Sequence, residues 1–377
     1  MKMTFKLDEP RIGAEEIEAV NRVLQSGWLS EGVVTRSFEE KITKYIGVSY
    51  AVATTSCTTA LYLALKSLGI KQGDEVILPD FTHPATGNVV KWLGATPVLV
   101  DVDIDSYNIS YAQLSKAITK RTKCIIPVSW GGNPLDLAHL KTILNNIKSN
   151  ISIVEDAACS LGSSYNDIKT GNLANITCFS MHPRKVITTG EGGMIVTNNC
   201  KIMHKLRRLK FFGSEKVSNE YKFLSEGLNF KLSDINSAIG SVQLDKLNKI
   251  VEKRIQMARY YSDALISSKL VNLRLKIPHY DEEAYHTFQT YAIYIMKEGI
   301  RDKIIQKLKV KGIETQIGTY ALHLQPYYFS STTRKVGKLE NSTKLYRNLL
   351  ALPMSYTMTQ ENQNTVIDEL EKILRGR

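Results

Sequence analysis

The chain has 377 residues, of which 43% are hydrophobic and 23% are charged, and its 23 glycines and 10 prolines exclude collagen-like and low-complexity sequences. No run of 18 apolar residues predicts a transmembrane helix, and the first residues lack the apolar core of a secretory signal, so we expect a cytoplasmic protein without a membrane anchor. The formal net charge of +12 is compatible with nucleic acid, an anionic membrane surface or a small phosphorylated ligand.

Short, β-branched apolar runs recur through the first half of the chain, which is typical of strands buried on both faces of a parallel sheet. These runs lie at residues 75–79, 96–101, 124–128, 151–156, 176–181 and 193–197. Amphipathic stretches such as 58–68 and 136–148 lie between several of them and predict helices. The alternation predicts an open α/β sheet, in which ligands bind beyond the carboxyl ends of the strands.

The pattern changes near Ser233, which we expect to cap one long helix over residues 233–265. A strand over 288–295, a helix over 299–311 and a final helix over about 359–375 follow. We therefore predict a large domain over residues 1–250 and a smaller α+β domain over residues 251–377.

The cysteines form no C-x-x-C pair, so neither a zinc site nor a disulfide framework is expected. We expect buried, reduced thiols and no bound metal. The five residues concerned are Cys57, Cys124, Cys159, Cys178 and Cys200.

Two motifs fall where the predicted sheet would bind a ligand. Ser56, Cys57 and Thr58 open the helix that follows the apolar run 50–53, and hydroxyls and free N–H groups at such a position can bind phosphate, although an ordinary N-cap is the more common explanation. Asp156 ends a predicted strand, where a carboxylate can meet a cation, a metal or a protonated ring nitrogen. A structural cap or salt bridge explains Asp156 equally well.

Lys185 lies in a loop between the predicted strand 176–181 and a glycine-rich turn. Most loop lysines are solvated surface residues, but one beside a cluster of other groups can have a lowered pKa and act as a nucleophile or base. The chain order of phosphate site, carboxylate, Ser180 and Lys185 is the order that pyridoxal-phosphate enzymes of fold type I require.

At these motifs the sequence resembles the DegT/StrS family of pyridoxal-phosphate-dependent nucleotide-sugar aminotransferases, and is similar to its 4-aminotransferases of the GDP-perosamine-synthase kind. The likeness covers nearly the whole chain and is most specific over residues 154–158, 180–193 and 228–238. It implies fold type I, an α/β fold with a mixed, mostly parallel sheet in the large domain and a smaller C-terminal α+β domain.

The resemblance also implies roles at the cofactor. Lys185 would bind pyridoxal phosphate covalently and transfer protons, and Asp156 would pair with the pyridinium nitrogen. Asn229 would reach the phosphate from the neighbouring subunit of a homodimer with shared active sites. The remaining cofactor contacts would be Ser56, Cys57, Thr58, His83, Cys159 and Ser180. Substrate contacts are expected from Trp28, Leu29, Ser30, Glu31, Arg184 and His323.

Several positions depart from the commonest family pattern. His83 replaces the aromatic ring that usually stacks on the cofactor, and Cys159 stands where a glutamine often contacts the ring oxygen. Ser56 and Cys57 replace an Asn-Gly pair, and Lys231 replaces an arginine. These departures bear on the preference for donor and acceptor more than on the fold.

Lys185 argues for transamination, because one branch of the family replaces it by histidine and becomes a sugar dehydratase. We expect L-glutamate as donor and a nucleotide-diphosphate-linked 4-keto-6-deoxy sugar as acceptor, with pyridoxamine phosphate as the intermediate form of the cofactor. The product would be a 4-amino-4,6-dideoxy sugar nucleotide for surface polysaccharide or glycoconjugate biosynthesis, such as lipopolysaccharide O-antigen.

Other functions stay open at this point. They are a 3-keto sugar aminotransferase, a dehydratase of the same family, a sulfur-transfer lyase and a non-catalytic cofactor-binding regulator. The basic run 205–210 could support binding of nucleic acid by a regulator. At helical spacing, however, its charges form a solvated face with Leu206 and Leu209 turned inward, so we expect no nucleic-acid partner.

Overall fold

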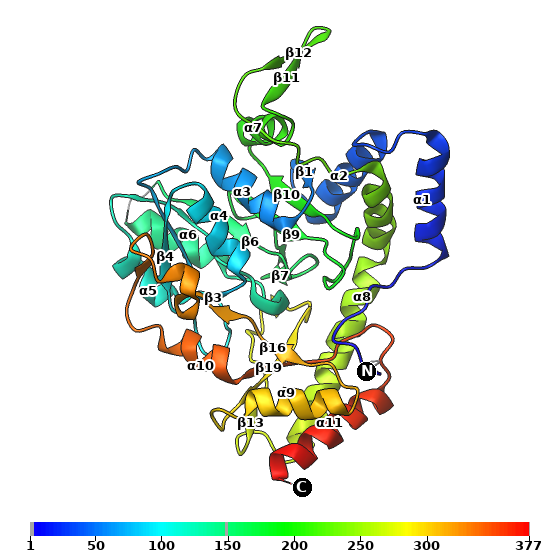
Figure 1. The fold of residues 1–377 in the computed structure, drawn as a ribbon, viewed down its shortest axis with the longest axis vertical. Helices are drawn as coiled ribbons and strands as arrows, with labels where there is room; N and C mark the ends of the chain where they lie inside the picture. Colours follow the sequence, from blue (N-terminus) through cyan, green and yellow to red (C-terminus); the bar gives the residue numbers. More distant parts are fainter. Residues whose placement is uncertain (1–3, 148–149, 377) are drawn as a thin grey trace.

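The computed structural model describes residues 4–147 and 150–376 and is built around one large sheet (Figure 1). Its strands are, in spatial order, β1 (Tyr50–Thr54), β10 (Gly193–Thr197), β9 (Ile176–Ser180), β6 (Ser152–Asp156), β5 (Thr122–Ile125), β2 (Glu75–Pro79), β4 (Thr96–Val100) and β18 (Arg334–Lys335). Only β10 runs antiparallel to its neighbours within this sheet. The predicted α/β class with a mostly parallel sheet is thereby confirmed.

All six predicted strands in the first half of the chain are present, with small shifts at their ends. Residues of β2, β9 and β10 are buried along their whole length, as an apolar run without alternation predicts. The run 124–128 differs most, since β5 ends at Ile125. Pro127 has no N–H group to donate to a neighbouring strand, and pairing resumes only at the isolated bridge between Val128 and Asp156.

Helices cover both faces of the large sheet. The helices over the first two hundred residues are α1 (Ala14–Ser26), α2 (Val33–Ile46), α3 (Cys57–Ser67), α4 (Pro84–Trp92), α5 (Tyr111–Ala117) and α6 (Leu137–Asn146), followed by α7 (Cys200–Lys210) and α8 (Asp234–Ser267). Ile195 packs with α3 and α7 on one face, whereas Met194 and Val196 pack with α2 and α8 on the other. The predicted end of the helix over 136–148 lies outside the described residues.

The C-terminal part has its own antiparallel sheet. Its order is β13 (Leu275–Lys276), β15 (Tyr291–Ile295), β19 (Leu349–Leu352) and β16 (Gln316–Ile317). This sheet packs against α9 (Arg301–Val310), α11 (Gln360–Arg375) and the end of α8 around a separate core. The strand predicted from residue 288 begins only at Tyr291, because Phe288 has a positive φ of 48°.

The long predicted helix is continuous as α8. Ser233 caps it, since its Oγ accepts a hydrogen bond from the Asn236 N–H at 3.2 Å. The helix runs through residue 250 without a break and contributes to cores in both parts of the chain. Residue 250 lies inside this helix, which joins the two sheets, so the division into domains at this residue stays a prediction.

Smaller elements complete the chain. They are the paired strands β3 (Phe81–Thr82) and β17 (Tyr320–Ala321), the sheet of β7 (Ser164–Tyr165), β8 (Ile168–Lys169) and β14 (Ala284–Tyr285), the hairpin β11 (Ser214–Val217) and β12 (Glu220–Phe223), the helix α10 (Glu340–Asn348), and the 3₁₀ turns η1 (Trp130–Gly132), η2 (Leu322–Leu324) and η3 (Pro326–Tyr328). The hairpin projects from the body of the molecule (Figure 1). Within residues 4–147 and 150–376, no helix combines the length and apolarity needed to span a bilayer.

Two expectations from the sequence need correction. Three cysteines are buried and Cys159 is partly buried, but Cys200 is exposed at the start of α7. The basic face predicted over 205–210 is not wholly solvated, since Lys210 is only 2% exposed. Leu206 and Leu209 do face the core as predicted.

Candidate active site

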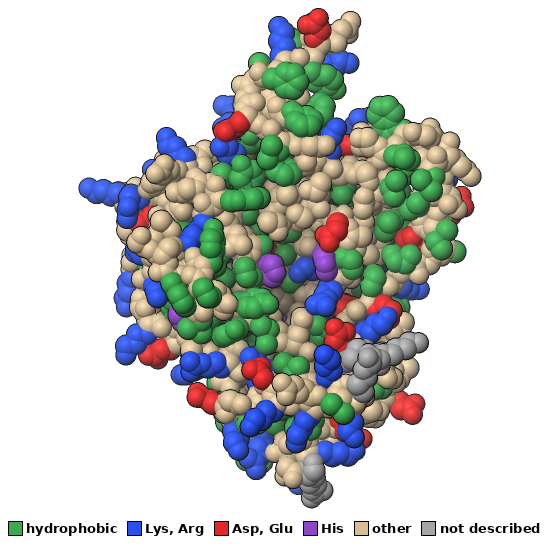
Figure 2. Space-filling view, in the orientation of Figure 1, with side chains coloured by type: hydrophobic (Ala, Val, Ile, Leu, Met, Phe, Trp, Pro, Cys, Tyr) green, Lys and Arg blue, Asp and Glu red, His purple; other side chains and the backbone are tan. Residues whose placement is uncertain are grey.

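The carboxyl ends of β1, β6 and β9 meet at one edge of the large sheet and open into a cavity of about 440 Å³. Figure 2 shows a hollow in the middle of this face of the molecule, with histidine side chains at its rim. Nine of the residues predicted from the sequence line the cavity: Ser56, Cys57, Thr58, His83, Asp156, Cys159, Ser180, Arg184 and Lys185. Segments far apart in the sequence thus come together at one place.

The start of α3 forms one wall of the cavity. Ser56 caps the helix, because its Oγ accepts from the Thr59 N–H at 3.1 Å while the Thr59 Oγ1 accepts from the Ser56 N–H at 3.0 Å. The next two N–H groups, of Cys57 and Thr58, belong to the first helical turn, which has no partners within the helix. A side chain on Gly193 would lie 2.3 Å from the Ser56 carbonyl, so this close approach requires glycine. The wall suits a phosphate group.

Asp156 forms the floor of the cavity and is only 5% exposed. Its Oδ2 accepts from the Thr86 Oγ1 at 2.8 Å, and its Oδ1 accepts from the Ala158 N–H at 3.2 Å. These bonds fix the carboxylate at the end of β6, where it can face a cationic ring nitrogen. Thr86 is itself within 3.0 Å of the Thr82 hydroxyl.

The neighbouring acid, Glu155, serves the fold instead. Its side chain accepts from the Ser129 hydroxyl at 2.8 Å and the Thr177 hydroxyl at 3.0 Å, away from the cavity wall. Burial raises the pKa of Glu155 to about 7, although the two hydroxyl donors oppose this rise. Of the two acids that end this strand, only Asp156 is therefore placed for chemistry in the cavity.

Two hydrogen bonds fix the position of Lys185. Its backbone N–H donates to the His182 carbonyl at 2.8 Å, and its side-chain amine donates to the Cys159 sulfur at 3.2 Å. Burial opposes a charge on Lys185, whereas Cys159 and Asp156 favour it, and the pKa of Lys185 lies above its ordinary value. The pKa of Lys185 is therefore shifted in the direction opposite to the lowering considered from the sequence. The amine is protonated near pH 7 and must lose a proton before it acts as a nucleophile or base.

His83 caps α4, and its Nδ1 accepts from the Ala85 N–H at 3.2 Å. Burial and the nearby Lys185 lower the pKa of His83, which outweighs the opposing effect of Asp156. The imidazole is therefore neutral near pH 7. A neutral ring can cover the face of an aromatic ligand without adding charge beside it.

The sequence did not single out several other residues of the site. Thr86, which is fully buried behind Asp156, could have been found from its spacing to Thr82 at the start of α4, and Gln289, at the cavity, from the polar segment before β15. Asp8 gave no signal, because its partner Arg254, at 2.5 Å, lies 246 residues away in the chain. Gln316 enters the cavity wall from the small sheet in the same way.

The structure places six predicted residues outside this cavity. Trp28, Ser30 and Glu31 line a second cavity of about 580 Å³ beneath the β11–β12 hairpin. Leu29 is exposed beside them, and Asn229 is exposed with its Oδ1 accepting from the Lys231 N–H at 3.4 Å. The sixth, His323, lies in the turn η2 directly after β17, with its Nδ1 2.5 Å from Asp80 Oδ2. The roles expected for these residues stay predictions.

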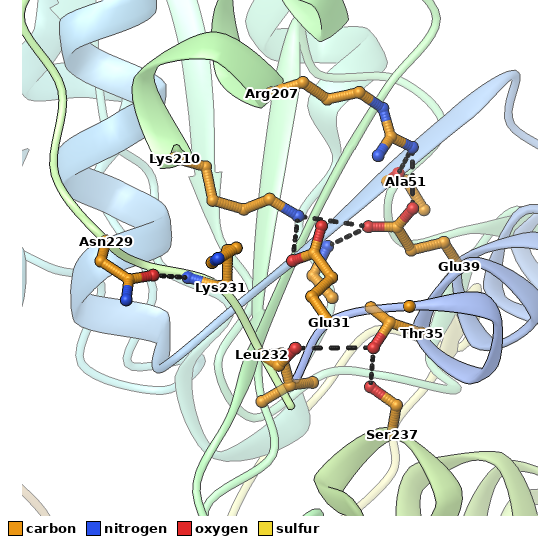
Figure 3. A network of polar contacts seen from close by, with 12 residues as sticks. Glu31, Thr35, Glu39, Ala51, Arg207, Lys210, Asn229, Lys231, Leu232 and Ser237 are labelled. Carbon is orange, nitrogen blue, oxygen red and sulfur yellow. Dashed lines mark hydrogen bonds and ion pairs between the residues drawn. The ribbon is translucent and has the colours of Figure 1, made fainter. Parts of the chain in front are cut away.

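A buried ion-pair network supports the segment that carries Glu31 (Figure 3). The Lys210 Nζ lies 2.8 Å from Glu31 Oε2 and 3.6 Å from Glu39 Oε1. Glu39 also pairs with Arg207 at 2.7 Å and accepts from the Ala53 N–H at 2.8 Å. The network therefore joins α2, β1 and α7 to the loop before α2, and it explains why Lys210 is buried.

The residues present at the first cavity fit pyridoxal phosphate. The cofactor needs separate partners for its phosphate, its ring nitrogen and its aldehyde carbon. The start of α3 with Ser180 offers hydroxyl and N–H donors, Asp156 offers a carboxylate held in place by Thr86, and Lys185 offers an amine whose contact in the chain is a thiol. All three partners line one cavity, as the resemblance implies.

Comparison with known proteins agrees with this site. Residues 10–371 match the DegT/DnrJ/EryC1/StrS aminotransferase family. The chain is 35% identical to the uncharacterized protein MJ1066 of Methanocaldococcus jannaschii over 97% of this chain and 96% of that protein. It is 32% identical to the spore coat polysaccharide biosynthesis protein SpsC of Bacillus subtilis, again over 97% of this chain and 96% of that protein.

Solved structures show the same fold. The putative sugar aminotransferase Spr1654 of Streptococcus pneumoniae, in its PMP-form, superposes with a TM-score of 0.91 at 27% identity, covering 99% of this chain and 100% of that one. Spr1654 has also been solved in a PLP-form, so the expected cofactor and its aminated form are both seen in a structural relative. The GDP-4-keto-6-deoxy-D-mannose-3-dehydratase of E. coli matches with a TM-score of 0.89 at 25% identity, over 99% and 100% of the two chains.

The fold-type I architecture and the aminotransferase class predicted from the sequence are confirmed by these matches. The family match covers nearly the whole chain, and two full-length relatives exceed 30% identity. This chain belongs to the DegT/DnrJ/EryC1/StrS aminotransferase family.

Proposed function

We propose that the protein transfers an amino group from L-glutamate to the 4-keto carbon of a nucleotide-linked 6-deoxy sugar. The observation that carries the proposal is the position of the Lys185 amine, between the hydroxyl-lined start of α3 and the fixed Asp156 carboxylate. The product, a 4-amino-4,6-dideoxy sugar nucleotide, would serve polysaccharide biosynthesis in the cytoplasm. The name of SpsC supports that process, and the sugar aminotransferase Spr1654 supports the substrate class.

Bound pyridoxal phosphate supplies an electron sink for cleavage of the donor's α-carbon–hydrogen bond. Lys185 would hold the cofactor, and its amine would move the proton at the substrate carbon. Asp156 would keep the ring nitrogen protonated, because its buried carboxylate favours a cation within contact distance. Thr58 and Ser180 would bind the phosphate through their hydroxyls, and His83 would cover the ring.

The competing dehydratase function is disfavoured by Lys185. By the resemblance, the dehydratase branch replaces this lysine by histidine, and His182 is a different residue whose ring accepts from the Arg184 N–H at 3.2 Å. A transaminase needs an amine at this position both to hold the cofactor and to move protons. The chain therefore has the residue that transamination requires.

We also propose that the enzyme is a homodimer with shared active sites. Asn229 is exposed and lies outside the cavity wall of its own chain, so it can reach a phosphate only in a second copy. Large apolar side chains are exposed before and at the start of α2 and in the β11–β12 hairpin, with Trp28 at 62%, Val33 at 68% and Phe223 at 72%. Exposed apolar side chains favour burial against another chain.

The experiment is a panel of acceptors. The purified protein is incubated with L-glutamate and the 4-keto-6-deoxy sugars linked to UDP, dTDP, GDP and CDP, and the products are analysed by mass spectrometry for exchange of a keto oxygen for an amine. We expect one of them to be aminated. Amination of a 3-keto sugar alone would contradict the position assigned here, and loss of the 3-hydroxyl without amination would show a dehydratase.

A further inference from the structure

The catalytic cavity contains a guanidinium group that the chain leaves largely free. Arg184 precedes Lys185, is exposed and lines the cavity. Its backbone is fixed on both sides, because its N–H donates to the His182 Nδ1 at 3.2 Å and its carbonyl accepts from the Gln289 amide at 2.7 Å. The origin of the side chain is therefore set relative to the catalytic amine.

The guanidinium itself makes few contacts among the described residues. Its Nη1 donates to the Gln316 Oε1 at 3.2 Å, and its Nη2 lies 3.8 Å from the Glu314 Oε1, at the long end of an ion pair. The other Glu314 oxygen accepts from the Leu7 N–H at 2.9 Å. Since a guanidinium has five N–H donors, Arg184 retains donors for a further planar acceptor.

A second arginine near the cavity shows the contrast. Arg254 is 3% exposed and is fully engaged by the Asp8 carboxylate at 2.5 Å and by the carbonyls of Phe288 and Gln289, both at 3.2 Å. Its positive charge is matched by a buried negative charge within the chain. Arg184 has no carboxylate at hydrogen-bonding distance among the described residues, so its charge is available to a ligand.

The two substrates differ in the groups that a guanidinium beside Lys185 could bind. An amino-acid donor carries at least one carboxylate, which a planar guanidinium binds through two parallel hydrogen bonds. The keto sugar carries no carboxylate, and its diphosphate, which a guanidinium can also bind, is separated from the reacting keto carbon by the sugar ring. A cation next to Lys185 would therefore act more on donor binding than on the sugar half of the reaction.

We propose that Arg184 binds a carboxylate of the amino-acid donor in the first half-reaction. The inference rests on the proposed function and assigns to Arg184 a role at one substrate only. Gln316 orients the guanidinium from the small sheet. The bound carboxylate takes the place of the long contact with Glu314.

The test compares Arg184→Gln and Arg184→Lys with the wild type and with Arg22→Gln, which removes an exposed arginine on α1 far from the cavity. Binding of glutarate, a dicarboxylate without an amine, is measured by titration calorimetry on the cofactor-loaded protein. We expect about 10- to 100-fold weaker binding in Arg184→Gln, intermediate binding in Arg184→Lys and no change in Arg22→Gln. Single-turnover experiments with L-glutamate should show the same loss in kcat/KM.

The second half-reaction supplies the readout that separates this proposal from the proposed function. Starting from the aminated cofactor form, transfer to the keto sugar should change less than about threefold in Arg184→Gln. Equal glutarate affinity in wild type and Arg184→Gln, or no glutarate binding to either, would overturn the role of Arg184. A third outcome would separate the two proposals: glutamate loses its amine only when Arg184 is present, but no sugar is aminated. This result would refute the proposed acceptor and support the proposed role of Arg184 in donor binding.

Discussion

If Asn229 acts in the neighbouring subunit, two inactive variants should restore each other. Lys185→Ala removes the catalytic amine, and Asn229→Ala removes a hydrogen bond to the phosphate, which costs about 10- to 100-fold for a bond to a charged group. Lys185 lines the cavity of its own chain, whereas Asn229 is exposed outside it. In a mixed dimer one cavity therefore has both residues intact and the other has neither.

The size of the recovery follows from symmetry. After random exchange of subunits, about half of the dimers are mixed, and each mixed dimer has one intact site of two. The mixture should therefore reach about one quarter of the wild-type activity, well above the sum of the separate variants. The assay is amination of the keto sugar, with differently tagged chains co-purified to measure the exchange.

A matched control uses two residues of the same cavity. Mixing Lys185→Ala with Asp156→Asn should restore nothing, because both residues line one cavity of one chain and every mixed site lacks one of them. The reasoning is refuted if exchange is complete but Lys185→Ala with Asn229→Ala stays at the sum of the separate activities. Equal recovery in the control pair would also refute it.

Three further predictions concern single residues. Thr86→Val should lower kcat about tenfold by releasing the Asp156 carboxylate, while Thr86→Ser keeps most of the activity, and the pH at which the cofactor's absorbance changes should shift only in the valine variant. Because the folded pKa of Glu155 is about 7, above the value of an unfolded carboxyl, the free energy of unfolding should fall as pH rises from 5 to 7, and Glu155→Gln should remove about 2 kcal/mol of this fall in urea titrations. Lys210→Met should destabilise the fold by about 3 kcal/mol by leaving Glu31 without its buried cation, while Glu39 keeps Arg207, and a lower urea midpoint that Glu31→Gln partly restores would support this.

The sheet could be predicted from the sequence because its strands are buried on both faces and contain almost no polar residue to break the pattern. Two short strands could not be predicted, β16 of the small sheet and β18 at the edge of the large sheet, since each is two residues long and carries no periodicity. Their positions depend on pairing with β19 and β4, which are distant in the chain.

The same distinction holds at the site. The positions of Asp156 and Lys185 could be predicted because Asp156 ends β6 and Lys185 lies in the loop that follows β9, so local pattern places both at one edge of the large sheet. Thr86, which holds Asp156 from behind the cavity wall, and Gln316, which lines the cavity, lie at helix and strand starts whose orientation depends on tertiary packing. The contacts that hold Glu155 away from the cavity likewise depend on Ser129 and Thr177, which no spacing indicates.

The structure explains two of the departures from the family pattern, at His83 and Cys159. A histidine at position 83 raised the question of a charge beside the cofactor ring, but the lowered pKa of His83 leaves the imidazole neutral near pH 7. Cys159, by contrast, contacts the Lys185 amine directly, where a thiol accepts only a weak hydrogen bond. The thiol holds the amine in the cavity but binds it less firmly than an amide oxygen would. The Lys185 amine must break this hydrogen bond before it moves a proton. A hydrogen bond to a thiol costs less free energy to break than one to an amide oxygen, so the substitution is compatible with transamination.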